Sequence, residues 1–130
     1  MTADLLHIGH IDMIRHCESL CDELYIGLIY NNGIKNYRGK EPIIDYKDRY
    51  DMLQNVIGWG TQIVGQECID PTENLKILEA DIMFSGDAFE PEECDAAIQL
   101  GIGICNTGRH GDISTTKIKE RVIKQNYGRK

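Results

Sequence analysis

The sequence predicts an α/β domain built on a parallel β-sheet with helices on both faces. Short, almost continuously apolar segments alternate along the chain with longer segments in which apolar residues recur at helical spacing. Alternation of strands and helices is typical of a parallel sheet with flanking helices. The 130 residues are enough for one hydrophobic core and too few for two. We therefore expect residues 1–130 to form a single domain.

The first half of the chain contains two helical and two strand-like segments. Ile11, Ile14 and Cys17 follow helical spacing, and the apolar run from Leu24 to Tyr30 is typical of a strand covered on both faces. The following stretch contains Asn-Asn-Gly and Arg-Gly-Lys, which is typical of a surface loop. In order, the expected elements are a helix over 8–21, a strand over 24–30, a loop over 31–40, a helix over about 45–57 and a strand over 62–69.

The second half continues the alternation. Thr72 is a suitable cap for a short helix, and the residues after Cys105 contain the glycines of a loop. The expected elements are a helix over 72–80, a strand over 82–85, a helix over 91–100, a strand over 102–105, a loop over 106–112 and a helix over 114 to about 124. The last residues, 125–130, are expected to form a polar tail.

Composition excludes several classes of function. The formal net charge of -7 and the pI near 5.0 argue against nucleic acid or an anionic membrane as a partner, because both favour a basic face. No run approaches the roughly 18 apolar residues of a membrane-spanning helix, and no secretion signal is evident. The five cysteines form an odd set without a Cys-x-x-Cys pair, which favours reduced core thiols over disulfides or a metal site. A soluble, cytoplasmic protein without a chain-ligated metal is expected.

The first motif with chemical content is His7-Ile8-Gly9-His10, directly before the first expected helix. Both imidazoles would lie near the unpaired amides and the positive dipole end of that helix, a place that favours phosphate. They can donate hydrogen bonds to a phosphoryl group, and Gly9 allows a nucleotide to lie close to the backbone. The other interpretation of so short a motif is two surface histidines.

The second motif runs Arg-His-Gly-Asp-Ile-Ser-Thr-Thr-Lys-Ile over residues 109–118. It combines a basic loop with three consecutive hydroxyl residues at the expected start of a helix, which is typical of a phosphate-binding site. The same hydroxyl residues also suit an N-terminal cap followed by two ordinary first-turn residues, with Arg109 solvated.

In this combination the two motifs resemble those of the cytidylyltransferase branch of the HxGH nucleotidyltransferases. The members for glycerol phosphate, phosphocholine and phosphoethanolamine pair His-x-Gly-His with a late Arg-Thr-x-Gly-Ile-Ser-Thr-Thr. Residues 2–10 are similar to the family's Gly-Thr-Phe-Asp-Leu-Leu-His-x-Gly-His, and residues 113–118 are a very close match. Residues 40–49 resemble its lysine and tyrosine-plus-arginine segment, and residues 85–87 its Gly-Asp after a strand. The resemblance covers nearly the whole chain and implies a Rossmann-like sheet, the HxGH nucleotidyltransferase fold.

The resemblance also implies a reaction. A phosphate oxygen of a small phosphorylated or phosphonylated alcohol would attack the α-phosphorus of CTP in line, and pyrophosphate would leave without a covalent enzyme intermediate. The enzyme would act by positioning and charge neutralisation, and Mg²⁺ would help pyrophosphate to leave. A homodimer is expected by the same resemblance.

Roles for individual residues follow from the resemblance. The implied catalytic residues, which stabilise the α-phosphate or neutralise phosphates, are His7, His10, Lys40 and Arg109. The implied nucleotide contacts are Thr2, Ala3, Asp4, Gly9, Asp87, Ile113, Ser114, Thr115 and Thr116. Ser114 and Thr115 would hold the β- and γ-phosphates, while Asp4 and Asp87 would touch the nucleoside or order the site. Lys40 and Arg49 would contact the acceptor substrate, with Lys35 as a rival for Lys40 and completion of the site as the other role for Arg49.

Three features depart from the family pattern. Family members have a hydrophobic strand before Gly-Thr-Phe-Asp, whereas this chain starts Met-Thr-Ala-Asp and has no residues for that strand. The strand would be central, and its loss would cost several kcal/mol in unpaired ladder groups, so we expect either preceding residues or a partner that fills the gap. Arg109 matches the family arginine only if His110 and Asp112 replace Thr and Gly. The loop over 31–45 does not identify the acceptor.

Two other functions stay open. Related families with a similar histidine-rich turn use ATP to build FAD or other dinucleotides, and the choice of nucleobase depends on hydrogen bonds to its edge that these motifs do not specify. A nucleotide-binding module without catalysis is the third possibility. The intact His7, His10, Ser114 and Thr115 argue against it.

Overall fold

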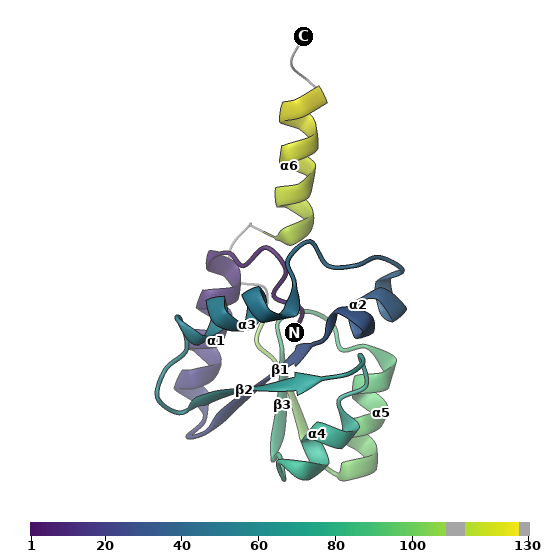
Figure 1. Ribbon diagram of the computed structural model, residues 1–130. Coiled ribbons are helices and arrows are strands. Elements are labelled where there is room, and N and C mark those ends of the chain that lie inside the picture. The colour runs from purple at the N-terminus through teal and green to yellow at the C-terminus, as the bar shows by residue number, and fades with distance from the viewer. Residues whose placement is uncertain (109–113, 128–130) are drawn as a thin grey trace.

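The computed structural model describes residues 1–108 and 114–127. Helices and strands alternate through most of the chain, as expected (Figure 1). Their order is α1 (Ile8–Leu20), β1 (Leu24–Ile29), α2 (Asn31–Arg38), α3 (Tyr46–Gln54), β2 (Thr61–Gln66), α4 (Thr72–Ile77), β3 (Ile82–Ser85), α5 (Pro91–Leu100), β4 (Gly103–Asn106) and α6 (Thr115–Tyr127).

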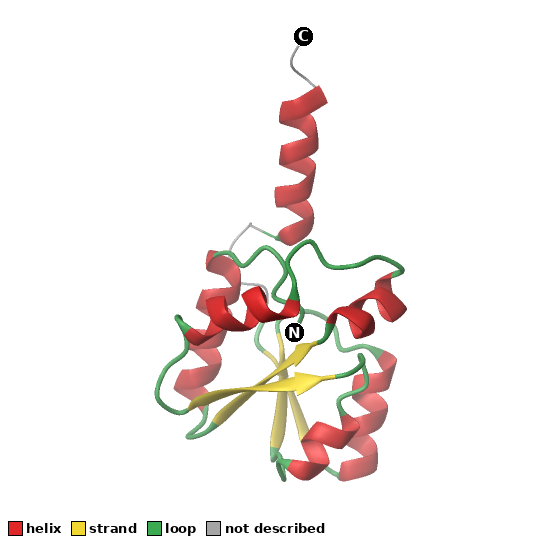
Figure 2. Ribbon diagram, viewed as in Figure 1, coloured by secondary structure: helices red, strands yellow, loops and turns green. Residues whose placement is uncertain are grey.

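The four strands form two parallel pairs instead of one continuous sheet. In the first pair Leu24 of β1 lies opposite Thr61 of β2. In the second pair Ile82 of β3 lies opposite Gly103 of β4. Helices α1 and α3 lie on one side of the strands, and α4 and α5 lie on the other (Figure 2). The predicted parallel α/β architecture is confirmed, but within the described residues no strand joins β1 to β3.

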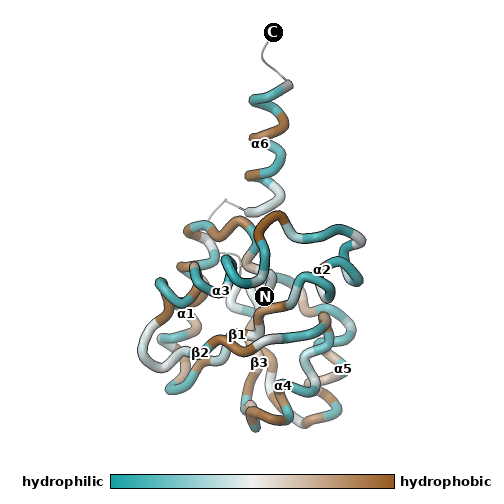
Figure 3. Tube along the Cα trace, viewed as in Figure 1, coloured by the Kyte–Doolittle hydropathy of each residue, from teal (hydrophilic) through white to brown (hydrophobic). Residues whose placement is uncertain are grey.

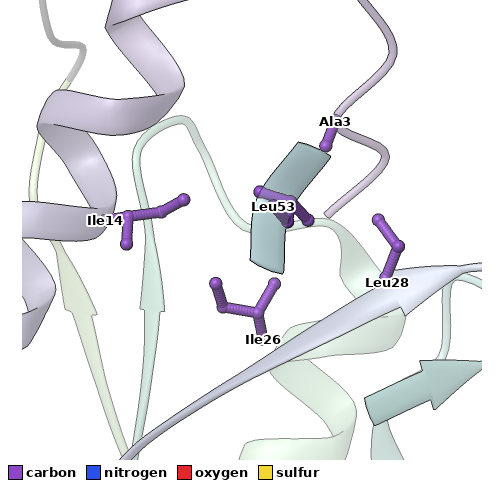
Figure 4. Close-up of a cluster of buried hydrophobic side chains, with 5 residues drawn as sticks. All are labelled: Ala3, Ile14, Ile26, Leu28 and Leu53. Carbon is purple, nitrogen blue, oxygen red and sulfur yellow. The ribbon is translucent and has the colours of Figure 1, made fainter. Parts of the chain in front are cut away.

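The hydrophobic core lies where α1 and α3 cover β1. Its buried members are Ala3, Ile14, Ile26, Leu28 and Leu53 (Figure 4). Leu28 and Leu53 are fully buried, and each such side chain stabilises a fold by roughly 1.5 to 3 kcal/mol. In Figure 3, β1 carries hydrophobic colour, in keeping with its place in the core, whereas α2 carries hydrophilic colour. The Ala3 side chain therefore packs in the core and does not face a nucleotide, contrary to expectation.

The expectation of a loop over 31–40 is wrong, because residues Asn31–Arg38 form α2. Asn and Gly have low helix propensity, and here packing overrides it. A Cβ on Gly33 would lie 2.2 Å from the carbonyl oxygen of Glu67, so only glycine allows α2 to approach the end of β2 this closely. Ile34 is buried beside it, and Gly39, at a φ of 77°, ends the helix in the left-handed conformation.

Other boundaries differ by a few residues. The helices expected over 45–57 and 72–80 end early, at Gln54 and Ile77, and β2 ends at Gln66. Residues 125–127, expected in a polar tail, continue α6, which projects from the rest of the molecule (Figure 1). In the part of the chain that the structure describes, no helix is long and apolar enough to cross a membrane.

The side chain of Arg49 is fully buried and fastens three segments together. Its Nη1 donates to the carbonyl oxygens of Thr2 at 2.7 Å and Ile29 at 2.9 Å. Its Nε donates to the carbonyl oxygen of Ile44 at 2.9 Å, and its Nη2 donates to Oδ1 of Asn31 at 2.8 Å. The guanidinium of Arg49 therefore holds together the start of the chain, the end of β1 and the loop before α3. A contact between Arg49 and the substrate does not fit this burial, whereas the expected alternative, completion of the site, does.

The Asp4 carboxylate binds the loop before α3, which Arg49 also contacts. The carboxylate accepts hydrogen bonds from the backbone N–H groups of Ile43 and Ile44, both at 2.9 Å, and only 4% of the residue is exposed. The burial does not fit a contact with a nucleoside, whereas the second expected role of Asp4, ordering the site, agrees with its hold on this loop. Ala3 and Leu5 flank Asp4 with φ values of 49° and 54°, a left-handed conformation that costs roughly 1 to 2 kcal/mol per residue. Such strain persists only where surrounding contacts enforce it.

Replacing Arg49 by Met is expected to lower the free energy of unfolding by at least about 3 kcal/mol, because it leaves three carbonyl oxygens without a donor. Urea unfolding followed by circular dichroism measures the change. Arg15→Met, on the exposed face of α1, is the matched control and should change stability by less than about 0.5 kcal/mol. Equal losses in the two variants would contradict the role assigned to Arg49.

Candidate functional site

The His7–His10 turn begins α1 and fixes both imidazoles through backbone amides. His7 is the N-cap, and its Nδ1 accepts a hydrogen bond from the N–H of Gly9 at 3.1 Å. Nδ1 of His10 accepts from the N–H of His7 at 3.2 Å. An imidazole nitrogen that accepts carries no proton, so each neutral ring holds its proton on Nε2. The turn thus presents two Nε2–H donors, a tautomer that the sequence did not reveal.

The two rings lie against each other and stay uncharged near neutral pH. Their centroids are 4.0 Å apart, at an interplanar angle of 37°. Burial lowers the pKa of His10 to about 4, helped by His7 and the chain's terminal amine, and burial also lowers the pKa of His7. The site therefore offers neutral hydrogen-bond donors, and its positive charge comes from other groups.

Both histidines line a cavity of about 270 Å³ in which distant parts of the sequence meet. The cavity is bounded by the start of α1, the start of α6 and the loop after β3. Its lining residues are Thr2, His7, Gly9, His10, Met13, Arg38, Gly86, Asp87, Gly108, Ser114, Thr115 and Thr116. Eight of the expected catalytic or nucleotide-contact positions line this cavity. Six of them come from the two motifs, and the other two are Thr2 and Asp87.

The first residues of α6 and its cap line this cavity, and the hydroxyl groups of Ser114 and Thr115 are already engaged. Oγ of Ser114 accepts from the N–H of Lys117 at 3.1 Å, as an N-cap does. Oγ1 of Thr115 donates to the carbonyl oxygen of Asp4 at 2.7 Å, which ties α6 to the strained loop. The first amides of a helix have no intrahelical partner and suit an anion. Ser114 therefore caps α6, as one of the two interpretations expected, and the hydroxyl cluster borders the cavity, while phosphate binding stays a prediction.

Arg38 is a cavity-lining cation that the sequence reasoning missed. It lies in the last turn of α2, just before Gly39, and the expectation of a loop there concealed it. Lys40 is exposed and does not line the cavity in this structure. Its rival Lys35 is exposed, with Nζ 3.8 Å from a carboxylate oxygen of Glu41. Arg38 is therefore better placed than either lysine to meet a bound anion.

Asp87 follows β3 at the cavity edge. Its backbone is fixed, since its carbonyl oxygen accepts from Oγ of Ser85 at 3.0 Å and from Nδ2 of Asn106 at 3.2 Å. Arg109 and Ile113, and the loop positions His110 and Asp112, lie outside the described residues. Within residues 1–108 and 114–127, no group of three or more His, Cys, Asp or Glu side chains could hold a metal ion.

The lowered pKa of His10 gives a stability prediction. Between about pH 6.5 and about pH 4 the unfolded chain binds a proton at His10 that the folded chain excludes, so the free energy of unfolding should fall as the pH falls through this window. His10→Gln should show a shallower fall in urea unfolding measured across it. Arg15→Gln, exposed on the same helix, should keep the wild-type slope. Identical slopes in all three proteins would contradict the buried, neutral state of His10.

Comparison with known proteins agrees with this geometry. Residues 2–121 match the family described as cytidylyltransferase-like. The chain is 28% identical to a FAD synthase of Korarchaeum cryptofilum over 131 residues, covering 95% of this chain and 88% of that protein. It is 31% identical to the bifunctional protein HldE of Helicobacter hepaticus over 100 residues, covering 69% of this chain and 19% of that protein.

A solved structure is also similar. The lipopolysaccharide core biosynthesis protein of Thermoplasma volcanium superimposes with a TM-score of 0.67 at 26% sequence identity, over 85% of this chain and 93% of that one. The match confirms the predicted parallel α/β fold. With a family match over nearly the whole chain, the nucleotidyltransferase prediction is confirmed, and the chain belongs to the cytidylyltransferase-like family.

Proposed function

We propose that the protein transfers a nucleoside monophosphate from a nucleoside triphosphate to a phosphorylated small molecule, with release of pyrophosphate, and that the cavity holds the phosphate chain. The observation that carries this proposal is that His7 and His10, each with its proton on Nε2, line one cavity together with the first residues of α6. At about 270 Å³ the cavity is near the lower end of ligand pockets, which span roughly 300 to 1,000 Å³, so it suits the phosphates better than a whole nucleotide.

In this proposal His7 and His10 donate to the non-bridging oxygens of the α-phosphate, where negative charge redistributes during transfer. The amides at the start of α6 and the Ser114 hydroxyl hold the β- and γ-phosphates at the positive end of the helix dipole. Arg38 supplies the formal positive charge that the neutral histidines lack. Arg109 and Ile113 keep their expected roles as part of the proposal.

The bond changes are those of an in-line displacement. An oxygen of the acceptor's phosphate forms a bond to the α-phosphorus, and the bond from that phosphorus to the bridging oxygen breaks. The bridging oxygen keeps the electron pair and leaves as pyrophosphate. No side chain becomes covalently bound, so the chain contributes orientation and charge stabilisation.

Mg²⁺ fits this site mainly as a companion of the nucleotide. Mg²⁺ is typically held by one or two carboxylates together with substrate phosphates and water. Asp87 lines the cavity and is the carboxylate placed to contribute, and the described residues contain no preformed cage. When bound, the ion would neutralise charge on the leaving pyrophosphate.

ATP is the nucleotide that the relatives favour. The FAD synthase of Korarchaeum cryptofilum matches 95% of this chain, and the formation of FAD requires an adenylyl group. CTP is the second candidate, favoured by the very close match of residues 113–118 to the cytidylyltransferase motif. The acceptor is proposed to carry a phosphate, and the homodimer stays a prediction.

The direct test is pyrophosphate release from each of the four nucleoside triphosphates with Mg²⁺ and a panel of phosphorylated acceptors, including FMN and sugar phosphates. Pyrophosphate release is expected with one nucleotide and one acceptor, and ATP is expected to give the highest rate. His10→Ala should lower kcat by about 100- to 1,000-fold, since it removes one preorganised donor. His16→Ala, exposed on α1, is the matched control and should leave the rate unchanged. Nucleotide binding without release under every condition would refute the proposal.

The placement of the cations gives a second test. Arg38→Met is expected to lower kcat/KM by about tenfold or more, because it removes a charged contact to the phosphates. Lys40→Met should change it less than about twofold, because Lys40 does not line the cavity. Steady-state kinetics on folded variants measures both values. The opposite ranking would show that Lys40, as expected from the sequence, is the phosphate contact.

A further inference from the structure

Two loops that follow neighbouring parallel strands form part of the wall of the cavity proposed to hold the phosphates. Gly86 and Asp87 follow β3, and Gly108 follows β4. At the last position of the β3–β4 ladder, Ser85 lies opposite Asn106. The two loops therefore leave the carboxyl ends of the strands side by side, which is where parallel α/β proteins bind ligands. The spacing between these loops shapes this side of the cavity.

The side-chain amide of Asn106 joins the two loops. Its Oδ1 accepts a hydrogen bond from the N–H of Gly108 at 2.8 Å, which closes a short turn after β4. Its Nδ2 donates to the carbonyl oxygen of Asp87 at 3.2 Å, 19 residues earlier in the chain. An amide suits both bonds because it carries an acceptor and a donor on one planar group. Asn106 is not among the described residues that line the cavity, so it can act there only through the two loops.

Close packing makes the spacing of the loops matter to the cavity. A Cβ on Gly86 would lie 3.0 Å from Sδ of Met13 on α1 and 3.4 Å from the carbonyl oxygen of Gly108. Gly86 therefore lies between the helix that carries His10 and the second loop. All four of these residues line the cavity. A change in the spacing of the two loops consequently moves the wall that a bound nucleotide would contact.

The ends of the strands are held together without Asn106. The carbonyl oxygen of Ser85 accepts from the N–H of Thr107 at 2.8 Å and from Oγ1 of Thr107 at 3.2 Å. These two bonds lie at the sheet, before the first loop begins. The bond from Asn106 to Asp87 lies beyond them, at the loops themselves. Loss of the Asn106 amide is therefore expected to free the loops while the strands stay paired.

The bland interpretation of Asn106 is that it only closes its own turn. Asn often accepts a hydrogen bond from the N–H two residues later, and Gly108 supplies that N–H here. The second bond, to Asp87, is not needed for such a turn. Its effect is to fix the first loop relative to the second, and both loops line the cavity.

We propose that Asn106 is a positioning residue for the nucleotide, because its amide holds the loops after β3 and β4 at the spacing that the bound nucleotide requires. This role rests on the function proposed above. Without the bond to Asp87 the loops occupy several spacings, and the nucleotide binds only the fraction of molecules in which the spacing is right. The apparent affinity falls by that fraction. Once the nucleotide is bound, the donors of His7 and His10 are unchanged, so kcat is maintained.

The test measures pyrophosphate release against nucleotide concentration, with the nucleotide and acceptor that the wild type uses. Asn106→Leu removes both bonds of the amide. Asn106→Ser keeps a neutral acceptor for the N–H of Gly108 but lacks the donor that reaches Asp87. Both variants are expected to raise the KM for the nucleotide by about three- to tenfold and to change kcat by less than about twofold.

Thr107→Val is the matched control, because it removes one hydrogen bond between the same two segments at the sheet. It should leave KM and kcat within about twofold of the wild type. Urea unfolding establishes that every variant is folded under the assay conditions. Isothermal titration with the nucleotide alone repeats the comparison without turnover, and its Kd values should follow the same ranking as KM.

Three results would overturn the role of Asn106. A wild-type KM in Asn106→Ser would show that the local turn is sufficient. A rise in Thr107→Val equal to that in Asn106→Leu, or a loss of kcat at unchanged KM, would show that Asn106 only supports the fold. These results require a wild type that turns over normally. A wild type that neither binds a nucleotide nor releases pyrophosphate would instead refute the proposed function, and the role of Asn106 with it.

Discussion

The buried guanidinium of Arg49 is the interaction on which the rest of the site depends. It binds the carbonyl oxygens of Thr2, Ile29 and Ile44, so the start of the chain, the end of β1 and the loop before α3 cannot move independently. The Asp4 carboxylate closes the arrangement through the amides of Ile43 and Ile44. Together these contacts maintain the left-handed conformation of Ala3 and Leu5, which the chain would otherwise leave.

The position of the histidines follows from that constraint. The strained loop places His7 at the N-cap of α1. Backbone amides of the turn donate to Nδ1 of each ring, so the proton of each ring lies on Nε2. The Thr115 hydroxyl donates a hydrogen bond to the carbonyl oxygen of Asp4 in the same loop. This bond positions the start of α6 at the cavity that the two rings line. One network of buried polar contacts therefore assembles both halves of the cavity, and the sheet serves as its support.

The sequence predicts this molecule best where local signals are strong. The strand β3 and the helix α5 lie where apolar runs and spacing place them, and the two motifs identify most of the cavity. The prediction from the sequence is wrong at α2. There Gly33 lies in a helix that packs so closely against the end of β2 that only a residue without a Cβ fits. Because residues 31–40 were expected to form a loop, the place of Arg38 at the cavity was not predicted. The sequence left two roles open for Arg49 and two for Asp4, because charged residues near a motif look the same whether they meet a ligand or bind the backbone.

The central claim is that two neutral imidazoles donate their Nε2–H groups to a nucleotide phosphate. Long-range ¹⁵N–¹H NMR of the imidazole rings near neutral pH, with and without a non-hydrolysable ATP or CTP analogue and Mg²⁺, tests it most directly. The account predicts unprotonated Nδ1 and protonated Nε2 in His7 and His10, with the Nε2 signals of both rings shifting when the nucleotide binds. Protonation at Nδ1, or saturating nucleotide without any shift of these signals, would contradict it.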